Sequence, residues 1–251
     1  PLKFIILTEA TDYRLRNTNQ LFQKNKQMSA FGKFILDFKI YLRVHGKYKK
    51  IFPGSKISSL LPKEIEKIIL LGTVIEKDVS FNSSLKFIGK HTYIGKNTAV
   101  MSCESIGSFC SISADVKIGL MSHPQDHVST SPAFYTKRRG LVPENKYDES
   151  EGRSVRIGDD VLISANVLIK NGVSVGTGAI IGAGSFVNED IPPYAIVAGS
   201  PAKIIKYRFE PNLIEKLLAS KWWERSDEEI KKAGNFDKPE KFLEAFKAQS
   251  K

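Results

Sequence analysis

The chain has 251 residues, of which 41% are hydrophobic and 26% charged, and its formal net charge is +11 at pH 7. This composition is typical of a globular protein with its own core, and the longest apolar runs, such as 4–7 and 68–71, are too short to cross a bilayer. No signal-peptide pattern is visible, so the predicted compartment is the cytoplasm.

The excess of positive charge does not by itself identify a partner. Nucleic acid, an anionic membrane surface and an anionic small molecule such as a phosphorylated cofactor are all compatible with it. The Lys and Arg residues are spread over the whole chain, and no helix-turn-helix, zinc-finger or aromatic–basic pattern is present. We therefore expect no nucleic-acid partner, and we keep a peripheral membrane contact as an alternative.

Residues 1–68 are predicted to form an N-terminal segment with one amphipathic helix, from Ser29 to Val44. Its apolar face comprises Phe31, Phe34, Ile35, Phe38 and Leu42. The opposite face is basic, so this helix either packs against the end of the following domain or lies on a membrane surface. We favour packing, and we expect the following domain to fold without residues 1–65.

A repeat of six residues organises the chain from residue 69 to residue 202. Aliphatic residues recur at that spacing in two blocks, which are Ile88, Ile94, Val100, Ile106, Ile112 and Ile118, then Ile157, Ile163, Ile169, Val175, Ile181 and Val187. A weaker set precedes them at Ile69, Ile75 and Phe81. A glycine often follows the aliphatic residue directly, as in Ile94-Gly95 and Ile181-Gly182.

A period of six fits neither an α-helix nor a free strand. It fits a short strand followed by a corner, and three such units close one triangular turn of about 18 residues. The inward aliphatic residues of stacked turns then form a continuous core. The predicted fold is therefore mainly β, a left-handed parallel β-helix over 69–202, because the hexapeptide repeat is typical of the left-handed form.

Residues 119–156 interrupt the repeat and show no regular apolar spacing. They contain His123-Pro124, Ser131-Pro132 and the basic run Lys137-Arg138-Arg139. A long loop that leaves a regular solenoid is usually functional or disordered. We predict that this one is an active-site loop.

The pattern turns helical after Ala202, so residues 203–251 are predicted to form a C-terminal helical segment. Pro211 opens a helix over 212–219, and Ser226 and Glu229 form a capping box for a second helix that ends at Gly234. A last short helix is predicted over 238–247.

Three stretches resemble the hexapeptide-repeat acyltransferases, and within them the xenobiotic acetyltransferase-like branch, which includes many sugar O-acetyltransferases. The stretches are 106–134, 157–187 and 191–209, the last followed by Trp222-Trp223. The Ser-Thr-Ser-Pro-Ala-Phe form of the loop, 129–134, is more similar to the sugar O-acetyltransferases than to the antibiotic-modifying enzymes.

The resemblance implies a homotrimer with each active site between neighbouring subunits, and it places the family's catalytic histidine on His123. A sugar hydroxyl is a poor nucleophile, and a neutral imidazole can take its proton as it attacks a thioester. His127 lies in the same segment but does not align with the family base. Asp126 is a candidate for orienting His123.

The resemblance also implies that acetyl-CoA, the acyl donor, lies in a groove between coils. Ala165 and Ala183 match family cofactor contacts, since small residues let the pantetheine arm approach the backbone. Lys203 and Lys206 match positions near the phosphates. Glu189 departs from the pattern, because relatives often carry a cation there.

The function predicted from these residues is acetyl-CoA-dependent O-acetylation of a sugar in surface polysaccharide biosynthesis, and no metal is expected. One alternative is N-acetylation of an amino sugar carried on a nucleotide. Another is a zinc-binding β-helix similar to a carbonic anhydrase, with His91, His123 and His127 as ligands. The spacing of Cys103 and Cys110 fits no redox or zinc motif, so both are predicted to be buried thiols.

Overall fold

The computed structural model describes residues 54–59, 61, 63–69, 71–81, 85–148 and 152–249, together with five single residues between 35 and 48. The helix predicted over 29–44 lies largely outside the described residues. Within it, Ile35, Phe38 and Leu42 are helical, and their side chains are exposed.

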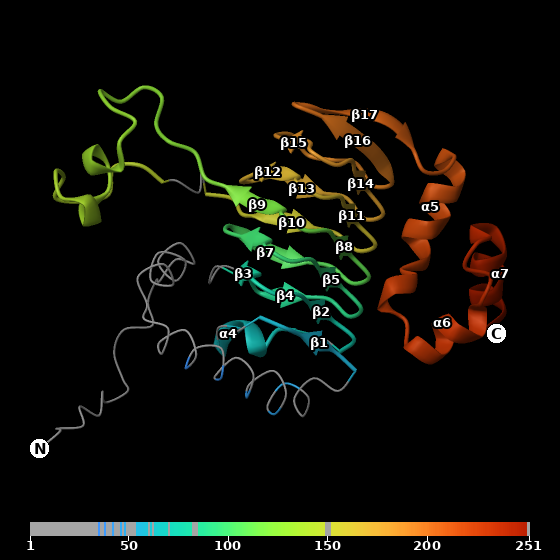
Figure 1. Ribbon diagram of the computed structural model, residues 1–251. Helices are drawn as coiled ribbons and strands as arrows, with labels where there is room; N and C mark the ends of the chain where they lie inside the picture. The colour runs from blue at the N-terminus through green and yellow to red at the C-terminus, as the bar shows by residue number, and fades with distance from the viewer. Residues whose placement is uncertain are drawn as a thin grey trace, which may run out of the picture.

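The chain winds into a solenoid with three sheets, and every described strand pair except β16–β17 is parallel (Figure 1). Sheet A contains β1 (Lys56–Ile57), β2 (Val74–Ile75), β5 (Tyr93–Ile94), β8 (Ser111–Ile112), β11 (Leu162–Ile163), β14 (Ile180–Ile181), β16 (Ala195–Gly199) and β17 (Ala202–Tyr207). Sheet B contains β4 (Phe87–Ile88), β7 (Cys103–Ile106), β10 (Val155–Ile157) and β13 (Ser174–Val175). Sheet C contains β3 (Ser80–Phe81), β6 (Ala99–Val100), β9 (Lys117–Leu120), β12 (Leu168–Lys170) and β15 (Phe186–Val187).

The aliphatic residues of the repeat stack in register inside this solenoid. In sheet A, Ile94 pairs with Ile112, Ile112 with Ile163, and Ile163 with Ile181, and all four are fully buried. Burying an aliphatic side chain of this size stabilises the fold by about 1.5–3 kcal/mol, so each residue of the column contributes to stability. The predicted parallel β-helix is confirmed.

Tight corners join the sheets, and glycine is required at several of them because the next coil lies directly against the backbone. At Gly107, a Cβ atom would lie 2.4 Å from the carbonyl oxygen of Gly158 on the next coil. The two coils cannot move apart at this point without breaking the hydrogen bonds between β7 and β10. Only glycine therefore fits directly after Ile106.

The start of the solenoid differs from the prediction. Parallel pairing begins at β1, which pairs with β2, so a coil precedes Ile69. Ile57, Leu61 and Ile65, the last in the short helix α4 (Lys63–Glu66), are buried and belong to the same core cluster as the repeat. The described part of residues 1–65 thus contributes to one end of the core, and the expectation that the following domain folds without residues 1–65 stays a prediction.

The C-terminal segment begins with a strand that the sequence did not predict, because β17 turns back antiparallel along β16. The predicted helices follow as α5 (Pro211–Ser220), α6 (Asp227–Ala233) and α7 (Pro239–Gln249), with a 3-10 turn (Trp222–Glu224) between the first two. Both halves of the predicted capping box form at Ser226 and Glu229. The helices cover one corner of the solenoid (Figure 1).

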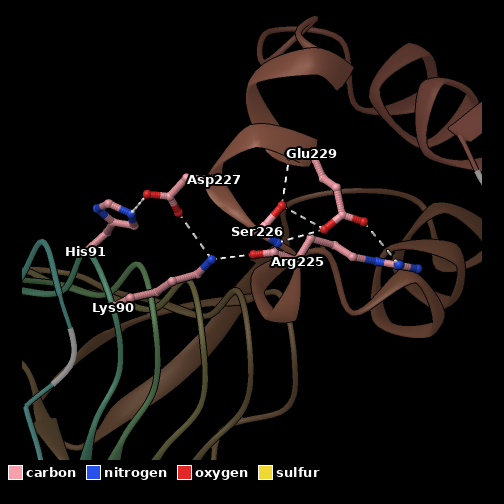
Figure 2. A network of polar contacts seen from close by, with 6 residues as sticks. All are labelled: Lys90, His91, Arg225, Ser226, Asp227 and Glu229. Atoms are coloured by element: carbon pink, nitrogen blue, oxygen red, sulfur yellow. Dashed lines mark hydrogen bonds and ion pairs between the residues drawn. The ribbon is translucent and has the colours of Figure 1, made fainter.

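A polar and aromatic contact fixes α6 to that corner (Figure 2). Asp227 lies 2.8 Å from His91 Nε2 and 3.3 Å from Lys90 Nζ, and Lys90 also donates to the carbonyl oxygen of Arg225. The His91 ring stacks on Phe109 at a centroid distance of 5.1 Å. Burial works to raise the pKa of Asp227, but its hydrogen bonds with His91 and Lys90 outweigh that effect and lower it.

Both cysteines are free thiols inside the solenoid, as predicted. Cys103 and Cys110 are 0% and 1% exposed, and burial raises the pKa of each to about 12. Thiols in that state act as small apolar side chains and not as nucleophiles.

Candidate active site

The loop that interrupts the repeat leaves the solenoid after β9 and returns at β10, so it spans 121–154. Figure 1 shows it extending away from the coils, on the side opposite α5 and α7. Its base carries His123, two residues after Met121, where the chain turns away from sheet C. The sequence placed the boundaries of this loop within a few residues.

His123 is exposed, yet one of its ring nitrogens is held from two directions. Nδ1 lies 2.9 Å from the carbonyl oxygen of Thr130 and 2.8 Å from the hydroxyl of Tyr135. A carbonyl oxygen can only accept a hydrogen bond, so Nδ1 carries a hydrogen, and in the neutral ring Nε2 then carries the lone pair. The loop therefore selects the tautomer in which Nε2 can act as a base.

Tyr135 is the anchor of this arrangement. Its side chain is fully buried, and its ring packs edge-on against His123, His127 and Tyr147 at centroid distances of 6.1, 6.3 and 5.5 Å. The hydroxyl of Tyr147 in turn lies 2.9 Å from Ser122 Oγ, beside His123. Two tyrosines from the far part of the loop therefore fix the segment that bears the histidine.

The predicted orienting residue, Asp126, does not take that role in the structure. No hydrogen bond joins Asp126 to His123 among the described residues, and the contacts to Nδ1 come from Thr130 and Tyr135. Sequence reasoning missed both, since a main-chain carbonyl has no sequence signature. The Tyr135 position carries a weaker signal, because it directly follows the Ser-Thr-Ser-Pro-Ala-Phe stretch.

The two predicted cofactor-contacting alanines lie one above the other at the corner between sheets A and C. Strand register pairs β11 with β14, and Gly184 N donates to the carbonyl oxygen of Ala165 over 3.0 Å. Ala165 is half-buried and Ala183 is exposed. The structure places these two residues at equivalent positions of successive coils, which we call the alanine strip.

The two predicted lysines lie on β17, next to the top of that strip. Lys203 pairs with Ala198 and Lys206 with Ile196 across the β16–β17 hairpin, and both lysines are exposed. Lys203 Nζ also lies 3.5 Å from the carboxylate of Glu189. That contact is solvent-exposed and weak, so it leaves Lys203 able to turn toward an anionic ligand.

Within one chain, His123 and the alanine strip are not neighbours. β9 and β12 run parallel in sheet C. Ala165 lies just before β12, whereas the loop with His123 begins just after β9. The two features therefore sit at opposite ends of the sheet C strands.

Two surface clefts accompany these features. One of about 370 Å³ lies where the loop returns, between Arg153 and Glu189. The other, of about 710 Å³, runs along the outer face of sheet B past Phe87, Arg156 and Pro193. Neither is lined by His123 or by the two alanines.

The histidines of the zinc alternative do not gather in this chain. His91 binds Asp227 on the corner that carries α6, while His123 and His127 lie in the loop. Across the described part of the chain, no group of three or more His, Cys, Asp or Glu residues is arranged to hold a metal ion. Nor does any helix described there have the length and apolar character needed to span a membrane.

Comparison with known proteins identifies the fold's family. The model of the bacterial transferase hexapeptide (six repeats) matches residues 154–189. A probable macrolide acetyltransferase of Lysinibacillus sphaericus is 42% identical over 129 residues, which are 50% of this chain and 71% of the relative. The chain belongs to the hexapeptide-repeat acetyltransferases. It is also 39% identical over 131 residues to a chloramphenicol acetyltransferase of Klebsiella aerogenes, covering 51% of this chain and 62% of that relative.

Among solved structures, a galactoside acetyltransferase in complex with coenzyme A is similar at 25% identity and a TM-score of 0.45, over 69% of this chain and 86% of that one. The chain spans less than two thirds of the length of the chloramphenicol acetyltransferases it matches. The hexapeptide-repeat family predicted from the sequence is confirmed.

Proposed function

We propose that the chain transfers an acetyl group from acetyl-CoA to a hydroxyl of a sugar, with His123 as the general base, in the biosynthesis of a surface polysaccharide. The observation that carries this proposal is the fixed tautomer of His123, whose free Nε2 lies at the exposed base of a long loop. The relatives that the chain matches are named as acetyltransferases, which supports the same class of reaction.

The proposed reaction needs one group that accepts a proton and later returns it. Nε2 of His123 takes the proton of the acceptor hydroxyl as its oxygen attacks the thioester carbonyl carbon. The C–S bond then breaks, and the imidazolium returns the proton to the sulfur of coenzyme A. Thr130 and Tyr135 stabilise the intermediate imidazolium, because both present oxygen acceptors to the Nδ1 hydrogen.

Acetyl-CoA is the proposed donor, and the alanine strip is its proposed contact. Ala165 and Ala183 present small side chains along the corner, so an extended pantetheine arm can reach main-chain groups there. Lys203 and Lys206 at the end of the strip supply positive charge for the phosphates. The cytoplasmic location predicted from the sequence stays a prediction.

The proposed assembly is a homotrimer in which each active site is shared. His123 and the alanine strip lie at opposite ends of sheet C, so one chain does not bring base and donor together. A closed ring of three chains does so three times, by placing the loop of one subunit beside the strip of its neighbour. The separation of the two features within one chain is what supports this proposal.

The test is a thiol-release assay with acetyl-CoA and a panel of free, nucleotide-linked and lipid-linked sugars, some with free amino groups. With the best acceptor, His123→Ala should lower kcat by about 100- to 10,000-fold, the usual contribution of a positioned acid–base group. The KM for acetyl-CoA should change little. If an amino sugar were the best acceptor, the reaction would be N-acetylation and not O-acetylation.

His127→Ala is the matched control. His127 lies in the same loop and packs against Tyr135, as His123 does, but it is not the proposed base. It should keep most of the activity. If the two substitutions exchanged their effects, His127 would be the base. If neither lowered the rate, the assignment of a histidine base in this loop would be wrong.

A further inference from the structure

The active-site loop carries a cluster of positive charge that the proposed reaction does not use. Lys137, Arg138 and Arg139 form a short 3-10 turn, and Lys146 returns beside them. All four side chains are exposed, and none makes a salt bridge to another residue in the part of the chain that the structure describes. We call these four residues the loop cations.

The segment that carries the loop cations is closed on itself. Lys146 N donates to the carbonyl oxygen of Tyr135 over 2.8 Å, and Lys137 N donates to Asn145 Oδ1 over 2.9 Å. Gly140 adopts a left-handed conformation with φ of 104°, which turns the chain back after Arg139. Residues 135–146 therefore form a small loop within the loop, with three of its cations on one turn.

This small loop is attached directly to His123. Tyr135, at one end, places its hydroxyl 2.8 Å from His123 Nδ1. Tyr147, just past the other end, contacts Ser122. The backbone that carries the cations is thus tied at both ends to the segment that contains His123.

Unpaired, exposed cations next to a reaction centre favour a ligand with negative charges. Residues in the same small loop supply only one acidic side chain, Glu144. Several cations spread along a turn suit a ligand whose charges are also spread out, whereas a single phosphate needs only one or two. The donor's phosphates already have Lys203 and Lys206 at the far end of the alanine strip.

We infer that the loop cations select the acceptor, and that this acceptor is an acidic oligosaccharide or polysaccharide whose carboxylates bind them while a nearby hydroxyl faces His123. This inference rests on the proposed function and specifies its acceptor. The loop cations also attract the acidic saccharide electrostatically before it binds. The affinity for this acceptor should therefore fall steeply as the salt concentration rises.

The first test measures binding without turnover. A fluorescently labelled oligogalacturonate and its methyl ester, which has the same hydroxyls and no charge, are titrated with the full chain and followed by anisotropy. Wild type should bind the charged probe at least about tenfold more tightly than the ester, since each exposed ion pair adds a modest increment. Lys137→Gln/Arg138→Gln/Arg139→Gln should lose that preference.

The control removes equal charge elsewhere, with Lys216→Gln/Lys231→Gln/Lys232→Gln on α5 and α6. These exposed lysines lie on the C-terminal helices, away from the loop, so the preference should survive. Equal binding of probe and ester by wild type would overturn the inference. So would loss of the preference in the control, which would show that net charge alone attracts the probe.

The second test uses the thiol-release assay and separates acceptor from donor. The loop variant should raise the KM of the best acidic acceptor about tenfold or more and leave the KM of acetyl-CoA unchanged. A raised KM for acetyl-CoA alone would instead assign the cations to the donor's phosphates and overturn the inference. Transfer to neutral sugars only would overturn it as well, while leaving the proposed function intact.

The two proposals fail separately. If the chain bound the charged probe selectively but transferred no acetyl group to any sugar, the loop cations would still be an anion-binding site. The proposed acetyltransferase activity would then be wrong. UDP-N-acetylglucosamine serves as a competitor in the binding test. If it displaced the probe completely at equal concentration, a nucleotide diphosphate and not a sugar acid would be the ligand, and the inference would be wrong.

Discussion

At the scale of single residues, the site depends on how one imidazole ring is held. The Thr130 carbonyl sets which nitrogen carries the hydrogen, and the Tyr135 hydroxyl adds a second acceptor on the same side. Tyr135 is fully buried, so the position of its hydroxyl is fixed by packing and costs no ordering during the reaction. In the proposed mechanism Tyr135 is a positioning residue, since it would act on the reacting atoms through His123.

Tyr135→Phe tests this role because it removes only the hydroxyl and keeps the ring in the aromatic cluster. A hydrogen bond to a charged group contributes about 1.5–3 kcal/mol, so kcat should fall roughly 10- to 100-fold. The KM for acetyl-CoA should not change, and neither should the melting temperature by more than a few degrees.

Tyr147→Phe is the matched control for that experiment. Its hydroxyl contacts Ser122 and not the imidazole, so its kcat should stay within a few-fold of wild type. Equal losses in both variants would show that the hydroxyls matter for loop folding alone, and an unchanged kcat in Tyr135→Phe would remove Tyr135 from the mechanism.

The sequence singled out His123 because its neighbours match a family motif, and its role as the base stays a prediction. The residues that contact its ring could not be predicted. Asp126 was the natural candidate, since carboxylates often orient catalytic histidines. In the structure a main-chain carbonyl from Thr130 takes that place, and any residue type could supply it. Irregular loops offer no periodicity from which such contacts can be predicted.

At the scale of elements, the hexapeptide repeat made the coils of the solenoid predictable, but it did not predict the elements at the two ends of the solenoid. Inward positions such as Ile94 and Ile163 repeat so regularly that their burial followed from spacing alone. β1 and α4 have only two and four residues. Ile57 in β1 is in phase with Ile69 and Ile75, but Lys63 interrupts the repeat between them, so the sequence did not mark this first coil as core. Their burial follows from stacking, because the first full coil needs a cover.

Ile65→Ala tests whether this first layer belongs to the folded unit. Ile65 is 1% exposed, and truncating a buried isoleucine typically costs about 2–5 kcal/mol. The free energy of unfolding measured with urea should fall by that amount. Leu71→Ala, at a site 58% exposed, should change it by less than about 0.5 kcal/mol. Equal small effects would place α4 outside the cooperative core.

At the scale of the whole molecule, one chain does not bring the proposed base and the proposed donor contacts together. Sheet C separates the loop with His123 from the alanine strip, and the two described clefts contain neither. The proposed trimer would complete the site by bringing the loop of one subunit to the strip of the next. The family resemblance predicted this sharing, and the positions of His123 and Ala183 in the fold give it a physical reason.

Complementation between two inactive chains tests the shared site most directly. One chain carries His123→Ala, and the other carries Ala183→Trp, whose bulky side chain blocks the strip at an exposed position and leaves the core intact. Each has its own affinity tag, and mixed trimers are purified through both. In a closed ring of three, every mixed trimer has one intact His123 facing one intact strip, so we expect about one third of the wild-type rate of thiol release. Mixed trimers no more active than either parent would contradict the account, because the base and the donor would then have to come from the same chain.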